Sequence, residues 1–525
     1  MTVLLDGHSL RIRDVVLLAT SPHNRIELSP KAQQAVQRSR AIVENYIASD
    51  EPIYGITTGF GEFANVRISP QDLEQLQENL IFSHSAGTGS WLPREIVRAM
   101  LILRINALAK GYSGIRLETL NTLVQMVNAD IIPAVPEQGS VGSSGDLVQL
   151  SHIALAALGK GRILLRNGEA QPSDAILRQH GITPVRLQAK EGLAMINGTQ
   201  MMCAFGTLSI DKALRLAYLA DVAGALSTEA LRGTDTAFDE RIHALRGFAG
   251  QRESARMLRA LMQGSQIRES HRDRTVDNRV QDAYSIRCMP QVHGASRDAL
   301  QYVASVIQTE INAATDNPLI FPADVPLGGI HLEGGNFHGQ PVALALDFLA
   351  IACAELANIS ERRIERLVNG SLSGLPRFLA PHGGVHSGLM IAQYTAASII
   401  SENKVLCHPA SVDSIPTSAN QEDHNSMGSI AAQKAWRVVH NLERVLAIEF
   451  LCATQGLDFL LPLRSSEPLE AVRTAIRSVV PFMESDRVVY DDIEAIRQLL
   501  EQGTIEQIVH RYYPYDYLLS SDTSY

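Results

Sequence analysis

The feature that most constrains the fold is a succession of long helical patterns in the last two thirds of the chain. From about residue 199 onward, apolar residues recur at the spacing of one face of a helix. Aromatic residues make up only 5% of the 525 residues, and several segments exceed the usual length of a globular helix. Long helices rich in Ala and Leu bury a shared apolar stripe in a bundle. The predicted helices span residues 199–232, 254–263, 295–314, 340–369, 386–405, 427–456, 467–481 and 489–502.

The first 198 residues carry shorter and more varied patterns. A strand is predicted at residues 2–5 and a small hairpin between residues 160 and 190. The predicted helices of this part lie at about 29–47, 70–85, 93–110 and 116–128. The chain is therefore predicted to be mainly α, with an N-terminal domain at residues 1–198 and a long helical bundle at residues 199–525.

Composition and charge argue against a nucleic-acid-binding protein, a disulfide-bonded protein and a membrane protein. The net charge of −10 argues against a nucleic-acid or anionic-membrane partner. The five cysteines are odd in number and far apart, as expected for reduced thiols in a cytoplasmic protein. The longest apolar segment, residues 341–359, is interrupted by Asp347 and Glu355, which favours a core helix over a membrane span.

One loop of the N-terminal part is unusually poor in side chains. Six of the seven residues from Gly139 to Gly145 are Gly or Ser, and an apolar run follows at residues 147–158. One interpretation is an ordinary turn or an anion nest at a helix N-terminus, although the nucleotide-binding glycine motifs are absent. The other is a reaction of the backbone itself. The Gly145 amide nitrogen would attack the Ser143 carbonyl, and loss of water from the ring and from Ser144 would leave an exocyclic methylidene.

Metal binding and serine hydrolysis have little support in the sequence. His331 and His338 lie near Glu333, and residues 422–424 form an acidic and histidine triplet, but neither group has the spacing of a known zinc motif. The serines at 143 and 144 are not in a G-x-S-x-G elbow. No metal site is predicted.

Polar, glycine-bearing islands interrupt the helical patterns, and in a helical protein such loops are where a site is built. Together with the Gly/Ser loop, these islands closely resemble motifs of the aromatic amino acid ammonia-lyase family. The resemblance extends from about residue 50 to residue 460. The islands are residues 54–61, 83–87, 197–199, 281–288, 315–318, 334–341 and 417–424.

The resemblance implies a fold, a prosthetic group and a reaction, and it favours the backbone reaction over an ordinary turn. The fold is a fumarase/aspartase-like helical bundle, assembled as a homotetramer whose active sites take residues from several subunits. In the family the loop tripeptide, here Ser143-Ser144-Gly145, cyclises to 4-methylidene-imidazol-5-one (MIO), and no external cofactor is used. The reaction is non-oxidative removal of ammonia from an aromatic amino acid. The electrophile captures the amine, and a base takes a weakly acidic β-proton.

The resemblance also assigns catalytic roles outside the loop. Tyr54 matches the family's base, which requires a stabilised phenolate. Arg287 matches an arginine that binds the substrate carboxylate through two parallel donors, and Tyr284, one helical turn earlier, matches a second tyrosine. Asn197 matches the residue that holds the carbonyl oxygen of the electrophile or the substrate carboxylate. Phe337 matches a phenylalanine that stacks near the electrophile. The alternatives are packed aromatic side chains and a structural ion pair.

Four residues bear on the choice of substrate. Ser83-His84 resembles the pair in members that deaminate histidine, although tyrosine aminomutases also carry it. Gln421-Glu422 resembles the same members, whereas phenylalanine and tyrosine enzymes typically have Gln at the position of Glu422. A carboxylate can accept a hydrogen bond from an imidazole N–H. Against a bare phenyl ring it would be an unpartnered buried charge, at a cost of roughly several kcal/mol. The predicted reaction is therefore conversion of L-histidine to trans-urocanate and ammonia, and the alternative for Glu422 is a structural carboxylate.

Some positions depart from the usual family pattern. Ser143 stands where Ala is common, and both are small enough for cyclisation. Val148-Gln149-Leu150 is similar to some tyrosine lyases. These departures keep open a tyrosine or phenylalanine ammonia-lyase, or a tyrosine 2,3-aminomutase. An inactive helical scaffold of the same fold is the third alternative.

Overall fold

The computed structural model describes residues 1–49, 53, 55–58, 68–69, 72–273, 279–323 and 329–514. Contacts group the chain into two compact units, each made of three stretches of sequence. Unit 1 contains Met1–Ser209, Ala304–Asp347 and Pro409–Gln433, and unit 2 contains Ile210–Val303, Phe348–His408 and Lys434–Tyr525. The sequence prediction divided the chain only once, after residue 198. The units are discontinuous because each of the four longest helices contributes one end to unit 1 and the rest to unit 2.

Unit 1 combines helices with short strands, and the strands that the structure describes form four two-stranded sheets. The predicted strand at residues 2–5 is β1, which pairs in parallel with β2, and the predicted hairpin is formed by β5 and β6. The elements of unit 1 include β1 (Thr2–Leu5), α1 (Ile12–Thr20), β2 (Arg25–Leu28), α2 (Pro30–Ala48), α3 (Leu73–His84), β3 (Thr88–Trp91), α4 (Arg94–Ala109), α5 (Leu117–Asn128), β4 (Pro136–Gln138), α6 (Leu147–Ala157), β5 (Arg162–Leu164), β6 (Ala170–Pro172), α7 (Ser173–Gln179), α8 (Glu191–Ile196), β7 (Leu319–Pro322), β8 (Gly329–Leu332) and the 3-10 turn η4 (Ser418–Asn420).

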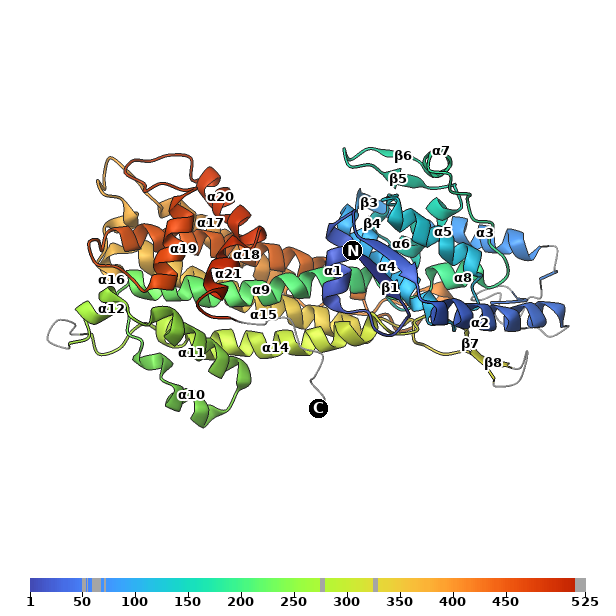
Figure 1. Ribbon diagram of the computed structural model, residues 1–525, viewed down its shortest axis with the longest axis horizontal. Coiled ribbons are helices and arrows are strands. Elements are labelled where there is room, and N and C mark those ends of the chain that lie inside the picture. Colours follow the sequence, from blue (N-terminus) through green and yellow to red (C-terminus); the bar gives the residue numbers. More distant parts are fainter. Residues whose placement is uncertain are drawn as a thin grey trace. The chain divides into compact units, whose positions relative to one another are not determined.

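The core of unit 1 is built around α4. Every residue of this helix from Ile96 to Ala109 is buried, and α1, α2 and α5 pack against it (Figure 1). The helix therefore buries its polar residues Arg98, Arg104 and Asn106, which donate hydrogen bonds to backbone carbonyls. Strand β3 pairs antiparallel with β4, with Thr88 opposite Gln138. This pairing brings the Gly/Ser loop, which starts directly after β4, close to the end of α3.

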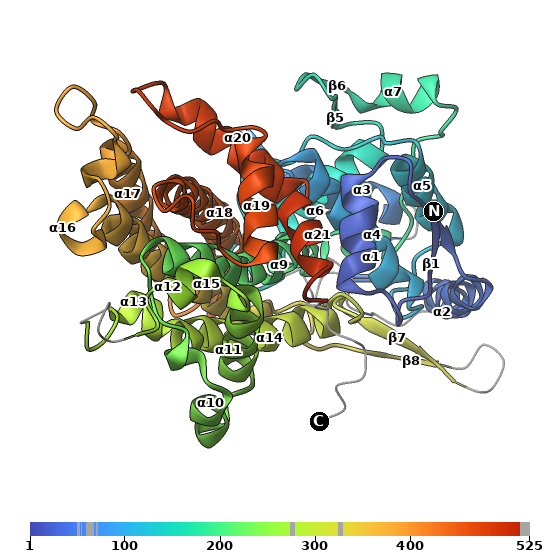
Figure 2. The same ribbon diagram turned by 60° about the vertical axis from the view of Figure 1, so that its left-hand side comes forward.

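Helices joined by loops form the described part of unit 2, in which no strand is assigned. Most of each long helix α9, α14, α15 and α18 belongs to it, and Figures 1 and 2 show these helices running side by side. Their bounds are α9 (Gln200–Ala230), α14 (Met289–Glu310), α15 (Gln340–Val368) and α18 (Gly428–Asp458). The shorter elements are η2 (Thr236–Phe238), α10 (Glu240–Arg246), α11 (Ala249–Met262), α12 (Gln266–Ser270), α13 (Tyr284–Arg287), α16 (Gly370–Ser373), η3 (Arg377–Leu379), α17 (Met390–Leu406), α19 (Glu467–Arg477), α20 (Val489–Glu501) and α21 (Thr504–His510).

Helix α15 contains the long apolar segment seen in the sequence. By length and composition it could cross a membrane, but 67% of its most apolar window is buried inside the protein. Its Ser360 hydroxyl donates to Glu449 of α18, and its Ala352 carbonyl accepts from Ser296 of α14. These contacts are those of a bundle core helix, as the sequence predicted.

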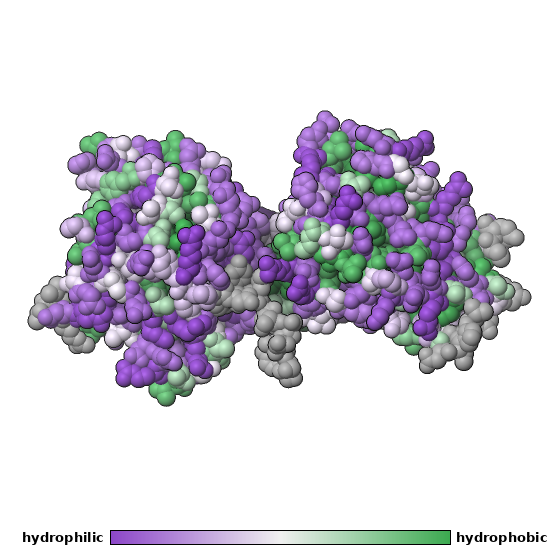
Figure 3. Space-filling model, viewed as in Figure 1, coloured by the Kyte–Doolittle hydropathy of each residue, from purple (hydrophilic) through white to green (hydrophobic). Residues whose placement is uncertain are grey.

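Several short helices were not predicted from the sequence, among them α1, α10 and α12. Helices α1 and α10 are 9 and 7 residues long, too short for a clear periodicity. Helix α12 is five residues long, and the Ser265 side chain caps its first turn. The surface around α10 is mostly hydrophilic (Figure 3).

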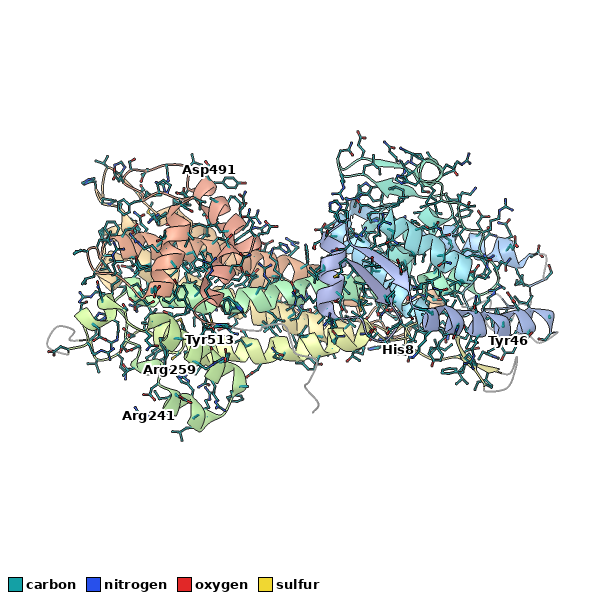
Figure 4. The ribbon with its side chains drawn as sticks, in the orientation of Figure 1. His8, Tyr46, Arg241, Arg259, Asp491 and Tyr513 are labelled. Carbon is teal, nitrogen blue, oxygen red and sulfur yellow. The ribbon has the colours of Figure 1, made fainter. Side chains whose placement is uncertain are left out.

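Tyr513, just after α21, is 7% exposed, and its hydroxyl donates a hydrogen bond to Glu253 at 2.9 Å (Figure 4). This contact anchors the end of the described chain.

Candidate active site

The backbone of the Gly/Ser loop packs closely against residues 197–199, one of the polar segments in which the sequence predicts a site. Gly145 has φ +71°, and a Cβ built on it would lie 2.0 Å from the Gly198 carbonyl oxygen. The Asp146 amide donates to the same oxygen at 2.8 Å. Only glycine fits this conformation and this approach, so the last residue of the Ser-Ser-Gly tripeptide is fixed by geometry.

The other side of the loop is held by two further segments of unit 1. The Val141 carbonyl accepts from the Met427 amide at 2.8 Å. The Gly142 carbonyl accepts from the Gly339 amide at 2.9 Å and from the Ser426 hydroxyl at 2.8 Å. The loop is therefore fixed by chain segments that follow it by roughly two hundred residues or more, and Ser426 and Met427 were not singled out in the sequence.

Asp146 anchors the end of the loop to the N-terminus of α9. Its carboxylate accepts from the amides of Met201 and Met202 at 2.8 and 3.0 Å, and from the Ser429 hydroxyl at 2.9 Å. These are first-turn amides of a 31-residue helix, where a negative charge is favoured. Burial nevertheless raises the pKa of Asp146 to about 6, because the hydrogen bonds offset the lost solvation only in part.

Glu422 points its carboxylate at the two serines of the tripeptide. The Ser144 hydroxyl donates to Oε1 at 2.5 Å, and the Ser143 hydroxyl donates to Oε2 at 3.2 Å. The Thr417 hydroxyl also donates to Oε2, at 2.7 Å. The structure thus brings the Gly/Ser loop into direct contact with the predicted specificity residue, across 278 positions of sequence.

The turn that carries Glu422 has an unusual backbone. Ser418, Ala419 and Asn420 have φ values of 52°, 52° and 69°, in the left-handed region that these side chains seldom adopt. Each such residue costs on the order of 1–3 kcal/mol and persists only where its surroundings impose it. Here the Thr417 amide donates to the Glu422 carbonyl at 3.0 Å and closes the turn. Strain of this kind clusters at functional sites, and here it lies in the turn that leads to Glu422.

Asn197 contacts the middle residue of the tripeptide. Its side-chain amide donates to the Ser144 carbonyl oxygen at 3.2 Å. Its own carbonyl accepts from Arg104, a fully buried side chain of α4, at 2.9 Å. Burial lowers the pKa of Arg104 to about 10. Arg104 also donates to Gln200 at 3.0 Å, so it fixes the whole island.

Ser83 and His84 end helix α3. His84 Nδ1 lies 2.9 Å from the Leu80 carbonyl, which can only accept, so Nδ1 carries the proton in this contact. The Ser83 hydroxyl donates to the same carbonyl at 3.0 Å. Burial lowers the pKa of His84, while the negative charge of Glu422 acts in the opposite direction. The neutral ring therefore has Nε2 as an acceptor.

Phe337 and Gln421 lie in the turns that support the loop. Phe337 is half-buried and precedes His338, whose amide donates to Gly335 at 2.9 Å. Gln421 is exposed. The ring of His338 stacks on that of His424 at 5.8 Å with an interplanar angle of 4°, a contact that the sequence did not indicate.

Two of the predicted catalytic residues, Tyr284 and Arg287, belong to unit 2. Tyr284 and Arg287 form helix α13 of unit 2, where the Arg287 guanidinium lies 5.1 Å from the centre of the Tyr284 ring. Tyr284 is 70% exposed. Tyr54 lies outside the described residues. Among the residues that are described, no group of three or more His, Cys, Asp or Glu side chains could hold a metal ion.

Comparison with known proteins gives a consistent result. Residues 10–478 match the model of the aromatic amino acid lyase family. A histidine ammonia-lyase from Gloeobacter violaceus is 54% identical over 508 residues, which cover 97% of each chain. The crystal structure of histidine ammonia-lyase from Trypanosoma cruzi superimposes with a TM-score of 0.91 at 47% identity, over 98% of this chain and 96% of that one. Tyrosine aminomutase from Streptomyces globisporus has a TM-score of 0.91 at 37% identity, over 99% and 100% of the two chains. The chain belongs to the aromatic amino acid lyase family.

Proposed function

We propose that this protein is a histidine ammonia-lyase that converts L-histidine to trans-urocanate and ammonia. The observation that carries the proposal is the Glu422 carboxylate at 2.5 Å from the Ser144 hydroxyl. A carboxylate at the reactive loop is compensated when the substrate offers an N–H, as imidazole does, and is left unpartnered by a phenyl ring. Relatives about 50% identical carry the same name, which supports the assignment.

We propose further that Ser143-Ser144-Gly145 matures to MIO. The fit of the loop supports this, because Gly145 has φ +71° and no room for a side chain, and Ser143 is small and 4% exposed. Asn197 donates to the Ser144 carbonyl oxygen and would hold the group in place. When formed, the group supplies an electrophile for the substrate amine.

Each of the other predicted site residues has a separate role in the proposed reaction. Asn197 stabilises negative charge on the oxygen that it contacts. Glu422 accepts the imidazole N–H, and His84 presents its unprotonated Nε2 to the same pocket. Tyr54 takes the β-proton, Arg287 and Tyr284 bind the substrate carboxylate, and Phe337 and Gln421 line the pocket with Ser83.

The oligomer and location are also proposals. We propose a cytoplasmic homotetramer in which Tyr284 and Arg287 act in the active site of another subunit. The 70% exposure of Tyr284 supports this, because an aromatic ring so exposed on a four-residue helix can contact a partner. The substrate is a small amino acid, and the net charge of −10 offers no general attraction for nucleic acid or anionic membranes.

Ser144→Ala tests the electrophile. The variant should lose the near-ultraviolet absorbance of MIO, keep the full mass of its sequence and lose turnover by roughly a thousandfold or more, since the barrier would rise by several kcal/mol. The wild type should be lighter than its sequence by two molecules of water. Ser140→Ala is the matched control, because Ser140 is in the same loop and its hydroxyl donates to Gln149. A fully active Ser144→Ala enzyme would refute the proposed chemistry.

Glu422→Gln tests the substrate. The amide keeps the shape of the side chain but removes the charge, so histidine turnover should fall much more than any turnover of tyrosine. Initial rates with both amino acids, measured on the wild type and the variant, decide the point. Equal losses would mean that Glu422 has a structural role.

A further inference from the structure

The two oxygens of the Glu422 carboxylate have different partners. Oε1 accepts from Ser144 at 2.5 Å. Oε2 accepts from Thr417 at 2.7 Å and from Ser143 at 3.2 Å. One oxygen is therefore bound by the hydroxyl that maturation would remove, and the other by two hydroxyls that maturation would leave in place.

Maturation of the loop affects these partners unequally. Closing the ring between the Gly145 nitrogen and the Ser143 carbonyl carbon releases one water, whose oxygen is that carbonyl oxygen. The second water carries away the Ser144 hydroxyl. The Ser143 side chain takes no part in either step, so its hydroxyl remains. Oε1 thus loses its donor, while Oε2 keeps both.

We propose that Ser143 is a positioning residue for substrate selection: with Thr417 it holds Oε2 of Glu422, so that Oε1 faces the imidazole N–H of the substrate. This inference rests on the proposed function. Ser143 is 4% exposed, so water does not compete freely for its hydroxyl. A hydrogen bond to a charged acceptor is stronger than a neutral one, and two donors on one oxygen restrict rotation of the carboxylate. The alanine common at this position in the family has no hydroxyl to donate.

The effect should appear in substrate binding and selectivity. Without the Ser143 hydroxyl, Glu422 keeps its charge and its bond to Thr417 but gains rotational freedom. We expect the KM for histidine to rise roughly threefold to tenfold, the range of one hydrogen bond, with kcat changed less. The KM for tyrosine, which has no imidazole, should change less than about twofold, so the histidine preference should fall.

The experiment compares Ser143→Ala and Ser143→Gly with the wild type, with Ser140→Ala as the control within the loop. Intact mass first verifies that each enzyme has lost two waters. Kinetics with histidine and tyrosine follow, for each variant alone and combined with Glu422→Gln. The proposal predicts that both variants raise the histidine KM and that this rise disappears in the Glu422→Gln background, because the hydroxyl then has no carboxylate to hold.

Three results would overturn the proposal: an unchanged histidine KM, an equal rise with tyrosine, or a rise that persists in the Glu422→Gln background. Loss of the mass deficit in both variants would also overturn it, since Ser143 would then act in ring formation. A wild-type enzyme that does not deaminate histidine would instead refute the proposed function, so the two failures are distinguishable.

Discussion

Two buried networks, one in the helical core of unit 2 and one around the Gly/Ser loop of unit 1, hold their charges in different ways. In unit 2, Arg363 and Glu449 lie 2.5 Å apart, and Asp221 lies 2.6 Å from Arg297 and 2.7 Å from His293. Every one of these acids has a cationic side chain as a direct partner. Burial alone would raise the pKa of Asp221, but Arg297 and the hydrogen bond from His293 outweigh it and lower the pKa to about 2.

In unit 1 the charges around the loop are held by neutral groups. Asp146 accepts from two backbone amides and a hydroxyl, Glu422 accepts from three hydroxyls, and Arg104 donates to carbonyl oxygens. Burial outweighs the hydrogen bonds to Asp146 and raises its pKa to about 6. In the network of unit 2 each acid has its charge compensated by a cationic side chain, whereas at the loop the neutral donors leave a net charge that a ligand can meet. Groups of the second kind are candidates for a functional site.

Breaking the ion-pair network should have the largest effect on stability. Arg363→Met leaves Glu449 as a buried, uncompensated charge, and the expected loss is about 3–5 kcal/mol. Chemical denaturation of the variant and the wild type measures it. Adding Glu449→Leu should recover much of the loss, because replacing both partners of a buried pair is often neutral. A variant as stable as the wild type would show that the network does not stabilise the fold.

Removing a neutral donor at the loop should act mainly on turnover. Asn197→Ala deletes the donor to the Ser144 carbonyl, and the expected fall in kcat is about 10²–10³-fold, as for the loss of one oxyanion donor. The free energy of unfolding should fall by only about 1 kcal/mol, the usual value of one hydrogen bond. Steady-state kinetics and denaturation of the same preparation separate the two effects. A large loss of stability with normal kcat would assign Asn197 a structural role.

The two aspartates should give pH dependences of opposite sign. The pKa of Asp146 is higher in the native state than in the unfolded state, so the native state holds the proton more tightly. As the pH rises from about 4 to about 6, Asp146 therefore lowers the free energy of unfolding by about 3 kcal/mol. The pKa of Asp221 is lower in the native state, so its contribution raises that free energy between about pH 2 and 4, by about 2 kcal/mol.

Denaturation midpoints across this pH range, for the wild type, Asp146→Asn and Asp221→Asn, measure both contributions. Each variant should lose only its own slope. If the free energy of unfolding depended on pH in the same way in both variants, the contrast between the two networks would be contradicted.

The sequence predicted local structure better than long-range contacts. The helices at 93–110 and 340–369 correspond to α4 and α15, because their apolar periodicity extends over many turns. The discontinuous units could not be predicted in this way, since they depend on where long helices leave one core and enter another. Short helices such as α1 have too few turns to show a period.

The sequence predicted individual residues of the site but not the contacts between them. Glu422 was chosen for its charge, yet its contact with Ser144 depends on the left-handed turn at residues 418–420, which no local pattern indicates. Arg104 was missed because an arginine in a helix usually marks an exposed face. The available signal was that its neighbours on every side of that helix are apolar, which implies a buried guanidinium.

The central claim of the proposed function is that a carboxylate beside the Gly/Ser loop selects an imidazole substrate. The most direct test incubates the purified, matured enzyme with equal concentrations of L-histidine, L-tyrosine and L-phenylalanine in parallel and follows the ultraviolet absorbance of each product. We predict that urocanate forms fastest by a wide margin. Faster formation of coumarate or cinnamate would contradict the account and assign the carboxylate of Glu422 a different role.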